Sequence, residues 1–220
     1  MEGTELISEN VIKEHKAKLE QHVADNNSEG IIEILLSLRV NALQIAPELR
    51  KSLVEELIRR DIFKISQEEN FKFLLHILSI KNKSLKHAIT SLISVVVSTI
   101  KGIEYITYNN NDAIIQRIIK ILYEQDNGNV TQRFCLAILQ KCSVKETIIG
   151  TYLDNDIINW VLKLVKTSFA IKIHMFCLDF ATAMLANVVH SKWCQINLAN
   201  KSEQTVYLMD SILKFIREPM

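Results

Sequence analysis

The stretch IIKIL at residues 118–122 places one lysine among four large apolar side chains. In a helix, consecutive residues are about 100° apart, so positions 1, 2, 4 and 5 of this pentad share one half of the surface. The third position then points to the opposite side, toward water. In a strand, positions 1, 3 and 5 would share a face and bury the lysine. The pattern therefore predicts an amphipathic helix with Lys120 in solvent.

The same pentad pattern recurs along the chain. The other copies are IIEIL at 31–35, LLHIL at 74–78, VLKLV at 161–165 and ILKFI at 212–216. Successive copies begin 43, 44, 43 and 51 residues apart. A near-constant period of this length is typical of armadillo and HEAT arrays. We therefore predict an all-α fold, an α-solenoid of about four armadillo-like helical repeats with an N-terminal cap helix.

The predicted organisation has an N-terminal segment followed by the repeat domain. Residues 1–28 form an amphipathic helix and linker, and residues 29–220 form the repeats. The expected repeats are 29–65, 66–108, 109–152, 153–200 and a partial repeat over 201–220. Within the first segment, Ile12, Leu19 and Val23 share one stripe of a helix over 8–24. That helix either covers the first repeat or belongs to the end of a coiled coil.

Local signals mark the expected helix ends. Pro47 suits the first turn of a helix, because its missing N–H has no intrahelical partner there. A long helix over 84–101 is expected to stop at Gly102. Ser66 and Glu69 have the spacing of a capping box. These signals place a pentad helix and a longer second helix in each repeat unit. The short segments 103–107 and 146–153 are candidates for the short first helix of an armadillo unit.

Composition and charge exclude several classes of protein. Apolar residues make up 48% and charged residues 23% of the chain, which is typical of a well-cored globular protein. Five glycines and two prolines leave little material for hairpins or phosphate-binding loops. The net charge of +1 is far from the basic footprint of a nucleic-acid-binding protein, so no nucleic-acid partner is expected.

Residues 169–189 are apolar over the length of a membrane span. Lys172, His174 and Asp179 lie inside this stretch, and each is costly in a bilayer, so we expect no membrane span. The first ten residues, MEGTELISEN, lack the basic region and apolar run of a signal peptide. We therefore expect the four cysteines to stay reduced in the cytosol.

The chain lacks the motifs that carry catalysis. No glycine-rich phosphate loop, Gly-x-Ser-x-Gly elbow or His-Glu-x-x-His helix occurs, so neither catalytic residues, nor a cofactor, nor a small-molecule substrate is predicted. Cys135 and Cys142 are seven residues apart and share the apolar face of one helix, which predicts buried thiols.

Two histidine–cysteine pairs have the spacing to offer two metal ligands each. They are His174 with Cys177, and His190 with Cys194. Neither has the close cysteine pair of a structural zinc site, so no metal is predicted. His174 also falls on the apolar side of its helix together with Cys177, which predicts a buried, hydrogen-bonded ring.

Three stretches carry a resemblance to a known family. They are TQRFCLAILQKCSV (131–144), LDNDIINWVLKLVK (153–166) and FCLDFATAMLANV (176–188). Over about residues 70–195 the chain resembles the armadillo core of the LisH-motif-containing armadillo-repeat proteins of cilia and basal bodies. The positions that match the family pattern are Leu139, Gln140, Lys141, Ser143, Trp160, Met184, Leu185 and Asn187.

The resemblance implies a non-catalytic scaffold of the cilium, basal body or axoneme that docks microtubule-associated proteins. The implied location is the cytoplasm and its cytoskeleton. The alternative is a cytosolic armadillo adaptor that binds an extended peptide in its concave groove. Either function needs an exposed face on the repeat helices.

Helical geometry selects the residues of that face. On residues 129–143, Arg133, Gln140 and Lys141 lie opposite the apolar side, and Asp179 occupies the corresponding face of residues 174–187. These four residues are the predicted partner-binding site. Trp160 is instead predicted to be a buried anchor between repeats.

Overall fold

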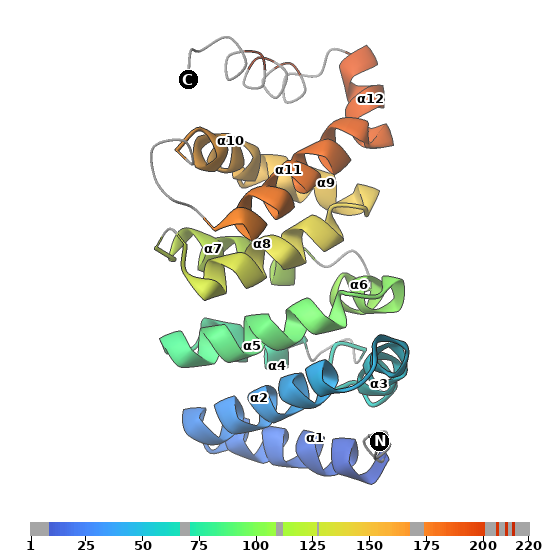
Figure 1. The fold of residues 1–220 in the computed structure, drawn as a ribbon, viewed down its shortest axis with the longest axis vertical. Coiled ribbons are helices and arrows are strands. Elements are labelled where there is room, and N and C mark those ends of the chain that lie inside the picture. The colour runs from blue at the N-terminus through green and yellow to red at the C-terminus, as the bar shows by residue number, and fades with distance from the viewer. Residues whose placement is uncertain are drawn as a thin grey trace. The chain divides into compact units, whose positions relative to one another are not determined.

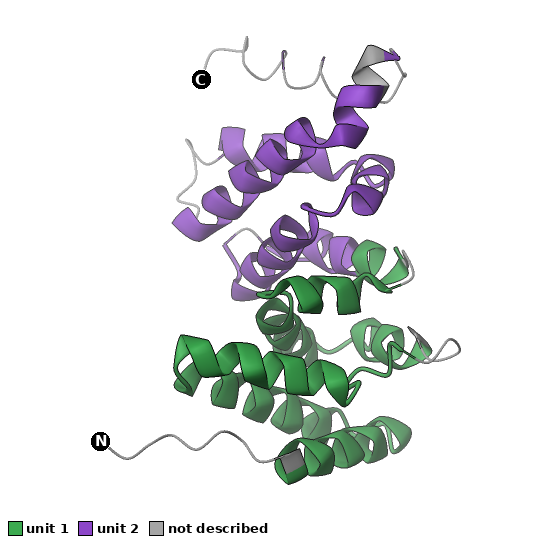
Figure 2. Ribbon diagram, turned by 90° about the vertical axis from the view of Figure 1, so that its right-hand side faces the viewer, with its two compact units in different colours: residues 1–117 green, residues 118–220 purple. Residues whose placement is uncertain are grey.

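The structure, a computed structural model, describes residues 9–66, 71–108, 112–126, 128–167 and 174–200, together with Val206, Asp210 and Leu213. This part of the chain contains helices and no strand, which confirms the all-α prediction. The chain divides into two compact units, Met1–Arg117 and Ile118–Met220 (Figure 2). The solenoid arrangement and the division into armadillo repeats stay predictions.

The described residues of the first unit form six helices and the beginning of a seventh (Figure 1). They are α1 (Glu9–Ala24), α2 (Ser28–Gln44), α3 (Pro47–Arg59), α4 (Phe71–Ser79), α5 (Lys83–Val96), α6 (Ile100–Ile106) and α7 (Ala113–Tyr123). The division between the units falls within α7. In this unit α2 packs most extensively against α5, and α3 packs against α6.

The described residues of the second unit form the end of α7 and five further helices. These are α8 (Val130–Cys142), α9 (Glu146–Asp154), α10 (Ile157–Thr167), α11 (Met175–His190) and α12 (Lys192–Ala199). The most extensive contact in this unit joins α8 to α11, and α10 also packs against α11.

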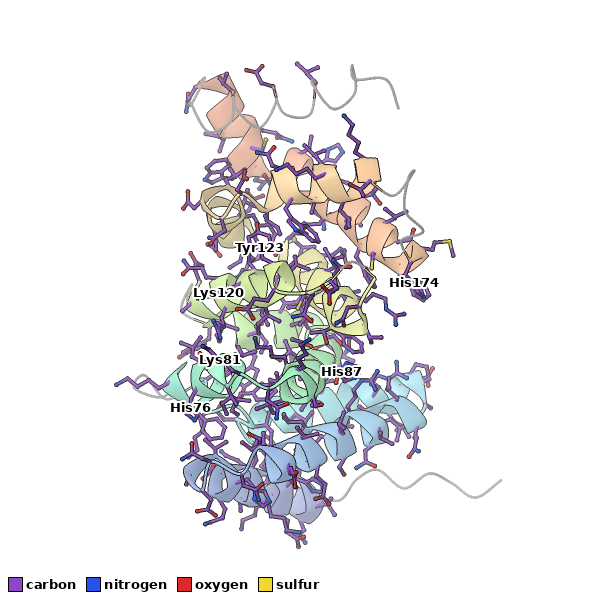
Figure 3. The ribbon with its side chains drawn as sticks, turned by 90° about the vertical axis from the view of Figure 1, so that its left-hand side faces the viewer. His76, Lys81, His87, Lys120, Tyr123 and His174 are labelled. Carbon is purple, nitrogen blue, oxygen red and sulfur yellow. The ribbon has the colours of Figure 1, made fainter. Side chains whose placement is uncertain are left out.

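The pentads behave as helical geometry predicts in the four copies that the structure describes. Their third residues are exposed: Glu33 in α2, His76 in α4, Lys120 in α7 and Lys163 in α10. The apolar positions around them are buried or half-buried, and Ile118 and Leu122 are fully buried. His76 and Lys120 are labelled in Figure 3. The fifth pentad, 212–216, lies outside the described residues apart from Leu213.

The helix α5 forms the centre of the first unit. Apolar side chains are buried around most of its circumference, including Leu85, Ile89 and Ile93. Two polar residues share this interior, and their hydroxyls donate to backbone carbonyls of the same helix. Thr90 Oγ1 donates to the oxygen of Lys86 at 2.6 Å, and Ser91 Oγ donates to that of Ala88 at 2.7 Å. These bonds remove the cost of burying a hydroxyl group.

A buried tyrosine fixes the loop that follows α3. Tyr105 Oη donates to Asp61 Oδ1 at 2.7 Å and accepts from the backbone N–H of Phe63 at 3.0 Å. Asp61 has a positive φ of 48°, and its carboxylate also accepts from the N–H of Ile65 at 2.7 Å. Burial and the neighbouring carboxylate raise the pKa of Tyr105 far above its ordinary value. The side chain is therefore a neutral donor that ties α6 to this loop.

The N-terminal helix was predicted over 8–24 and is observed as α1. Ile12 and Leu19 are buried, and Val23 is half-buried, as the stripe predicted. The helix packs against α2 and α3. This is the contact expected of a covering helix.

The prediction that one long helix runs to Gly102 is wrong. The helix α5 ends at Val96, Thr99 accepts from the N–H of Gly102 at 3.0 Å, and Gly102 lies inside α6. A Cβ atom at residue 102 would lie 1.8 Å from the Val96 carbonyl oxygen. The glycine is therefore required for the close approach of α6 to the end of α5, and it does not stop a helix.

The other predictions about helix bounds have different outcomes. Pro47 is the first residue of α3, as predicted. The capping box cannot be followed, because Glu69 lies outside the described residues. The apolar helix predicted over 169–189 is described from Met175 to His190 as α11.

The pentad in α7 gives a direct test of the packing. Replacing Ile118 with Ala should lower the free energy of unfolding by about 2–5 kcal/mol, because the side chain is fully buried. Replacing Lys120 with Glu should change it by about 0.5 kcal/mol or less, because that side chain is exposed. Urea unfolding measured by circular dichroism gives both values. Equal losses in the two variants would contradict the orientation of α7.

Candidate functional site

The predicted site lies on α8 and α11, so the local structure of α8 sets its geometry. The side chain of Asn129 accepts from the N–H of Thr131 at 2.7 Å and begins the helix. Cys135, Leu136, Ile138, Leu139 and Cys142 are all buried on one face. The remaining face carries Arg133, Gln140 and Lys141, as helical geometry predicted.

The helix α11 covers part of this polar face. Arg133 Nη1 lies 3.1 Å from His174 Nε2, at the beginning of α11. Near the other end of α8, Asn187 Nδ2 donates to Ser143 Oγ at 2.8 Å and lies 3.5 Å from the Gln140 carbonyl oxygen. The contact between α8 and α11 therefore carries polar bonds at both of its ends.

The four predicted site residues differ in their exposure. Arg133 and Gln140 are half-buried at the contact between α8 and α11. Lys141 on α8 and Asp179 on α11 are exposed. The structure thus brings Arg133 and Gln140 to one contact, and it leaves Lys141 and Asp179 with their side chains toward solvent.

The prediction that His174 is a buried ring is wrong. The residue is exposed and precedes the first residue of α11, where its Nδ1 accepts from the N–H of Phe176 at 3.3 Å (Figure 3). Arginine can only donate, so the contact with Arg133 requires Nε2 to accept. A neutral imidazole has one accepting nitrogen, so only one of these two bonds forms at a time. The helix begins one residue after His174, which removes this ring from the buried stripe.

Aromatic side chains form an exposed ridge at the beginning of α11. The rings of His174 and Phe176 stack with centroids 5.2 Å apart, and those of Phe176 and Phe180 with centroids 6.5 Å apart. Met175 is 69% exposed and Phe176 is 53% exposed. We call these four residues the α11 ridge. Sequence reasoning missed the ridge, although the run HMF places three large side chains immediately before Cys177.

Trp160 is half-buried at the surface, so the prediction of a buried anchor is wrong. Its ring lies 6.0 Å from that of Tyr123, whose Oη donates to the carbonyl oxygen of Asn155 at 2.6 Å (Figure 3). Burial and the nearby carboxylate of Asp156 raise the pKa of Tyr123 to about 12. The pair therefore joins α7 to α10 at the surface of the second unit.

The cysteines are interior side chains. Cys135, Cys142, Cys177 and Cys194 are all buried free thiols, which confirms the prediction for the first two. Burial raises the pKa of Cys142 to about 12 and also raises the pKa values of Cys177 and Cys194. A thiol must ionise to act as a nucleophile, so these groups are poorly suited to nucleophilic chemistry.

Within the described residues, no group of three or more His, Cys, Asp and Glu side chains is arranged to hold a metal ion. No helix of this part is long and apolar enough to cross a membrane.

A groove between α3 and α6 was not predicted. It has a volume of about 820 Å³ and lies within the first unit. One wall consists of Pro47, Arg50, Lys51 and Glu55 on α3, at the spacing of one helix face. No direct signal for it occurs in the sequence, because its second wall comes from residues about fifty positions further along the chain.

The second wall of the groove is formed by Ile100, Lys101 and Glu104 on α6, together with Ser98 and Thr99 just before this helix. Lys101 Nζ and Glu55 Oε1 form an ion pair of 3.0 Å between the walls. The hydrogen bond and the charge of Lys101 lower the pKa of Glu55. Ile100 is 76% exposed.

Comparisons of the chain with protein-family models, curated proteins and solved structures find no match. The resemblance to the ciliary armadillo family therefore stays a prediction from the residues quoted above.

The buried thiols lead to a prediction about reactivity. At pH 8.5 the native protein should react with a chromogenic disulfide reagent at none of its four cysteines, because all four thiols are buried. The same protein in concentrated guanidinium should react at all four. Rapid modification of any thiol under native conditions would contradict the burial.

Proposed function

We propose that this protein is a non-catalytic scaffold that docks a protein partner in a cilium, basal body or axoneme. The docking part of the proposal rests on the α11 ridge and the neighbouring Arg133. The ciliary setting, with microtubule-associated proteins as partners, rests on the resemblance over residues 70–195.

The exposed chemistry of the α11 ridge is the observation that carries the docking proposal. Aromatic side chains, methionine and arginine are enriched at the centres of protein interfaces. Met175 and Phe176 are more than half exposed, and Arg133 contacts His174 at the edge of the ridge. A partner that covers this surface would bury two large apolar side chains that the free protein exposes to water.

An unsatisfied donor on Arg133 supports docking at the same surface. Its Nε–H is buried and has no acceptor, while its Nη1 lies next to His174. An unsatisfied buried donor costs about 1–3 kcal/mol. Departures of this kind from good packing are expected mainly at functional sites. The guanidinium lies at the edge of the ridge, so a carboxylate of a partner that covers the ridge can accept a hydrogen bond from it.

A cytosolic adaptor that binds an extended peptide is the second candidate. The polar groups on α8 and α11 favour it, because Lys141 and Asp179 are exposed on neighbouring helices and can bind the main chain or the charges of a peptide. The two candidates differ in cellular position. A scaffold of the cilium is expected as puncta at basal bodies or along the axoneme, and an adaptor is expected to be diffuse.

The docking proposal predicts a specific loss of binding. Replacing Met175 and Phe176 with Ser should reduce the capture of partners from ciliated cells by about tenfold or more, because exposed aromatic side chains often dominate an interface. Thermal melting should change little, since both side chains are largely in solvent. Quantitative mass spectrometry of the captured proteins measures the effect.

Val40→Ser is the matched control, because Val40 is 42% exposed on α2 in the first unit. It should leave capture unchanged. If the double variant captures the same proteins in the same amounts as the wild type, the α11 ridge is not the docking surface. If the tagged wild type is diffuse in ciliated cells, the adaptor replaces the ciliary scaffold.

A further inference from the structure

The groove between α3 and α6 has an uneven distribution of charge. Lys101 is paired with Glu55, which leaves Arg50 and Lys51 as the other cations of the walls. Among the described residues, no carboxylate forms an ion pair with either of them. The Lys51 charge contributes to the lowered pKa of Glu55 from a distance. One end of the α3 wall therefore carries two cations that have no contacting anion.

Arg50 is held in a fixed position at this wall. Its Nε donates to the carbonyl oxygen of Ala42 at 2.8 Å, near the end of α2. This bond orients the guanidinium and leaves its two terminal amino groups for another acceptor. Lys51 follows it on the same helix and is exposed. Together they form a positive pair at which a carboxylate can bind.

Apolar surface accompanies the two cations. Ile100 is the first residue of α6 and is 76% exposed, and Pro47, also exposed, is the first residue of α3. Both line the groove. On the same wall as Ile100, the exposed carboxylate of Glu104 can accept hydrogen bonds from a peptide backbone. The groove thus offers contacts for an anion, an apolar side chain and backbone N–H groups.

The size of the groove fits a short segment of chain better than an ion. Its volume of about 820 Å³ lies toward the upper end of the range for bound ligands, which is roughly 300–1,000 Å³. Its walls are surface helices with long charged side chains. The ion pair between Lys101 and Glu55 is exposed and contributes little free energy, so a bound peptide can replace it with its own contacts at little cost in free energy.

We propose that the groove between α3 and α6 binds a short extended peptide whose acidic side chain pairs with Arg50 and Lys51 and whose apolar side chain packs on Ile100. The proposal rests on the function proposed above, a module that docks proteins, and adds a second docking site with a defined chemistry. It differs from the α11 ridge in position, since the groove belongs to the first unit.

A labelled peptide tests the groove directly. The probe is a fluorescein-labelled nonapeptide of Glu and Leu residues separated by Ser, and its control replaces each Glu with Lys. Fluorescence anisotropy should show saturable binding of the acidic peptide only, and the binding should weaken as salt is added. Amide shifts in an NMR titration should be largest in α3 and α6.

Two variants separate the charge from the apolar contact. Lys51→Gln and Ile100→Ser should each weaken binding of the acidic peptide by about fivefold or more, while both proteins melt like the wild type. Lys18→Gln is the matched control, because Lys18 is exposed on α1 and does not line the groove. It should bind like the wild type.

The proposal is overturned if the lysine peptide binds as well as the acidic one, if neither peptide binds, or if Lys51→Gln and Ile100→Ser leave binding unchanged. None of these results affects partner capture through Met175 and Phe176. Loss of the groove proposal is therefore distinguishable from loss of the proposed scaffold function.

Discussion

Burial of wide apolar helix faces is the constraint on which this structure depends. A helix that contains such a pentad, with one charge among four apolar residues, has a wide apolar face. A single neighbouring helix cannot cover that face. In the first unit, α5 provides the interior against which α2 packs, and in the second unit α8 and α11 cover one another. The apolar surface removed from water in these contacts is the main favourable term in the folding of each unit.

Polar bonds then fix the segments between these helices. The Tyr105 hydroxyl ties the loop after α3 to α6 through Asp61, and Asn187 ties α11 to the end of α8 through Ser143. The carboxylate of Glu146 accepts from the N–H groups of Lys192 and Trp193 and so caps the beginning of α12. Each of these bonds joins positions that are more than forty residues apart. They set the positions of α6, α11 and α12 and hence the surfaces available to a partner.

The position of the two candidate surfaces follows from this arrangement. The α11 ridge lies at the helix end beside Arg133, where α8 leaves Met175 and Phe176 uncovered. The groove lies where α6 packs against α3. The start of α6 also lies close to the end of α5, and Gly102 permits that approach because it has no side chain to meet the Val96 carbonyl. Both surfaces therefore depend on how the helices of their own unit pack.

Helical periodicity alone was enough to predict the buried and exposed sides of α2, α4, α7 and α10, and of α8 with its two cysteines. Periodicity failed at helix ends. His174 was placed on the wrong side, because its assignment assumed that α11 had already begun. Gly102 was taken as a stop, because its role depends on a contact with Val96 that only the folded chain provides. Trp160 was expected in the interior, but its ring lies half-buried beside Tyr123 at a surface that the sequence does not define.

The groove could not be predicted for a related reason, because it joins residues near 50 to residues near 100 and is not a pattern within one segment. The α11 ridge lies within one segment, but its exposure depends on where α11 begins and on what α8 covers. The choice of Arg133 and Gln140 as site residues identified the correct face of α8. It did not anticipate that α11 covers part of that face.

Native-state hydrogen exchange tests the central claim most directly, because the protection of each amide reports the free energy of opening its helix. The interior position of α5 predicts that the amides of Leu85–Val96 exchange among the slowest in the first unit, near the rate set by its unfolding. The amides of α1, which has a largely exposed outer face, should exchange faster. Equal or faster exchange in α5 than in α1 would contradict the account.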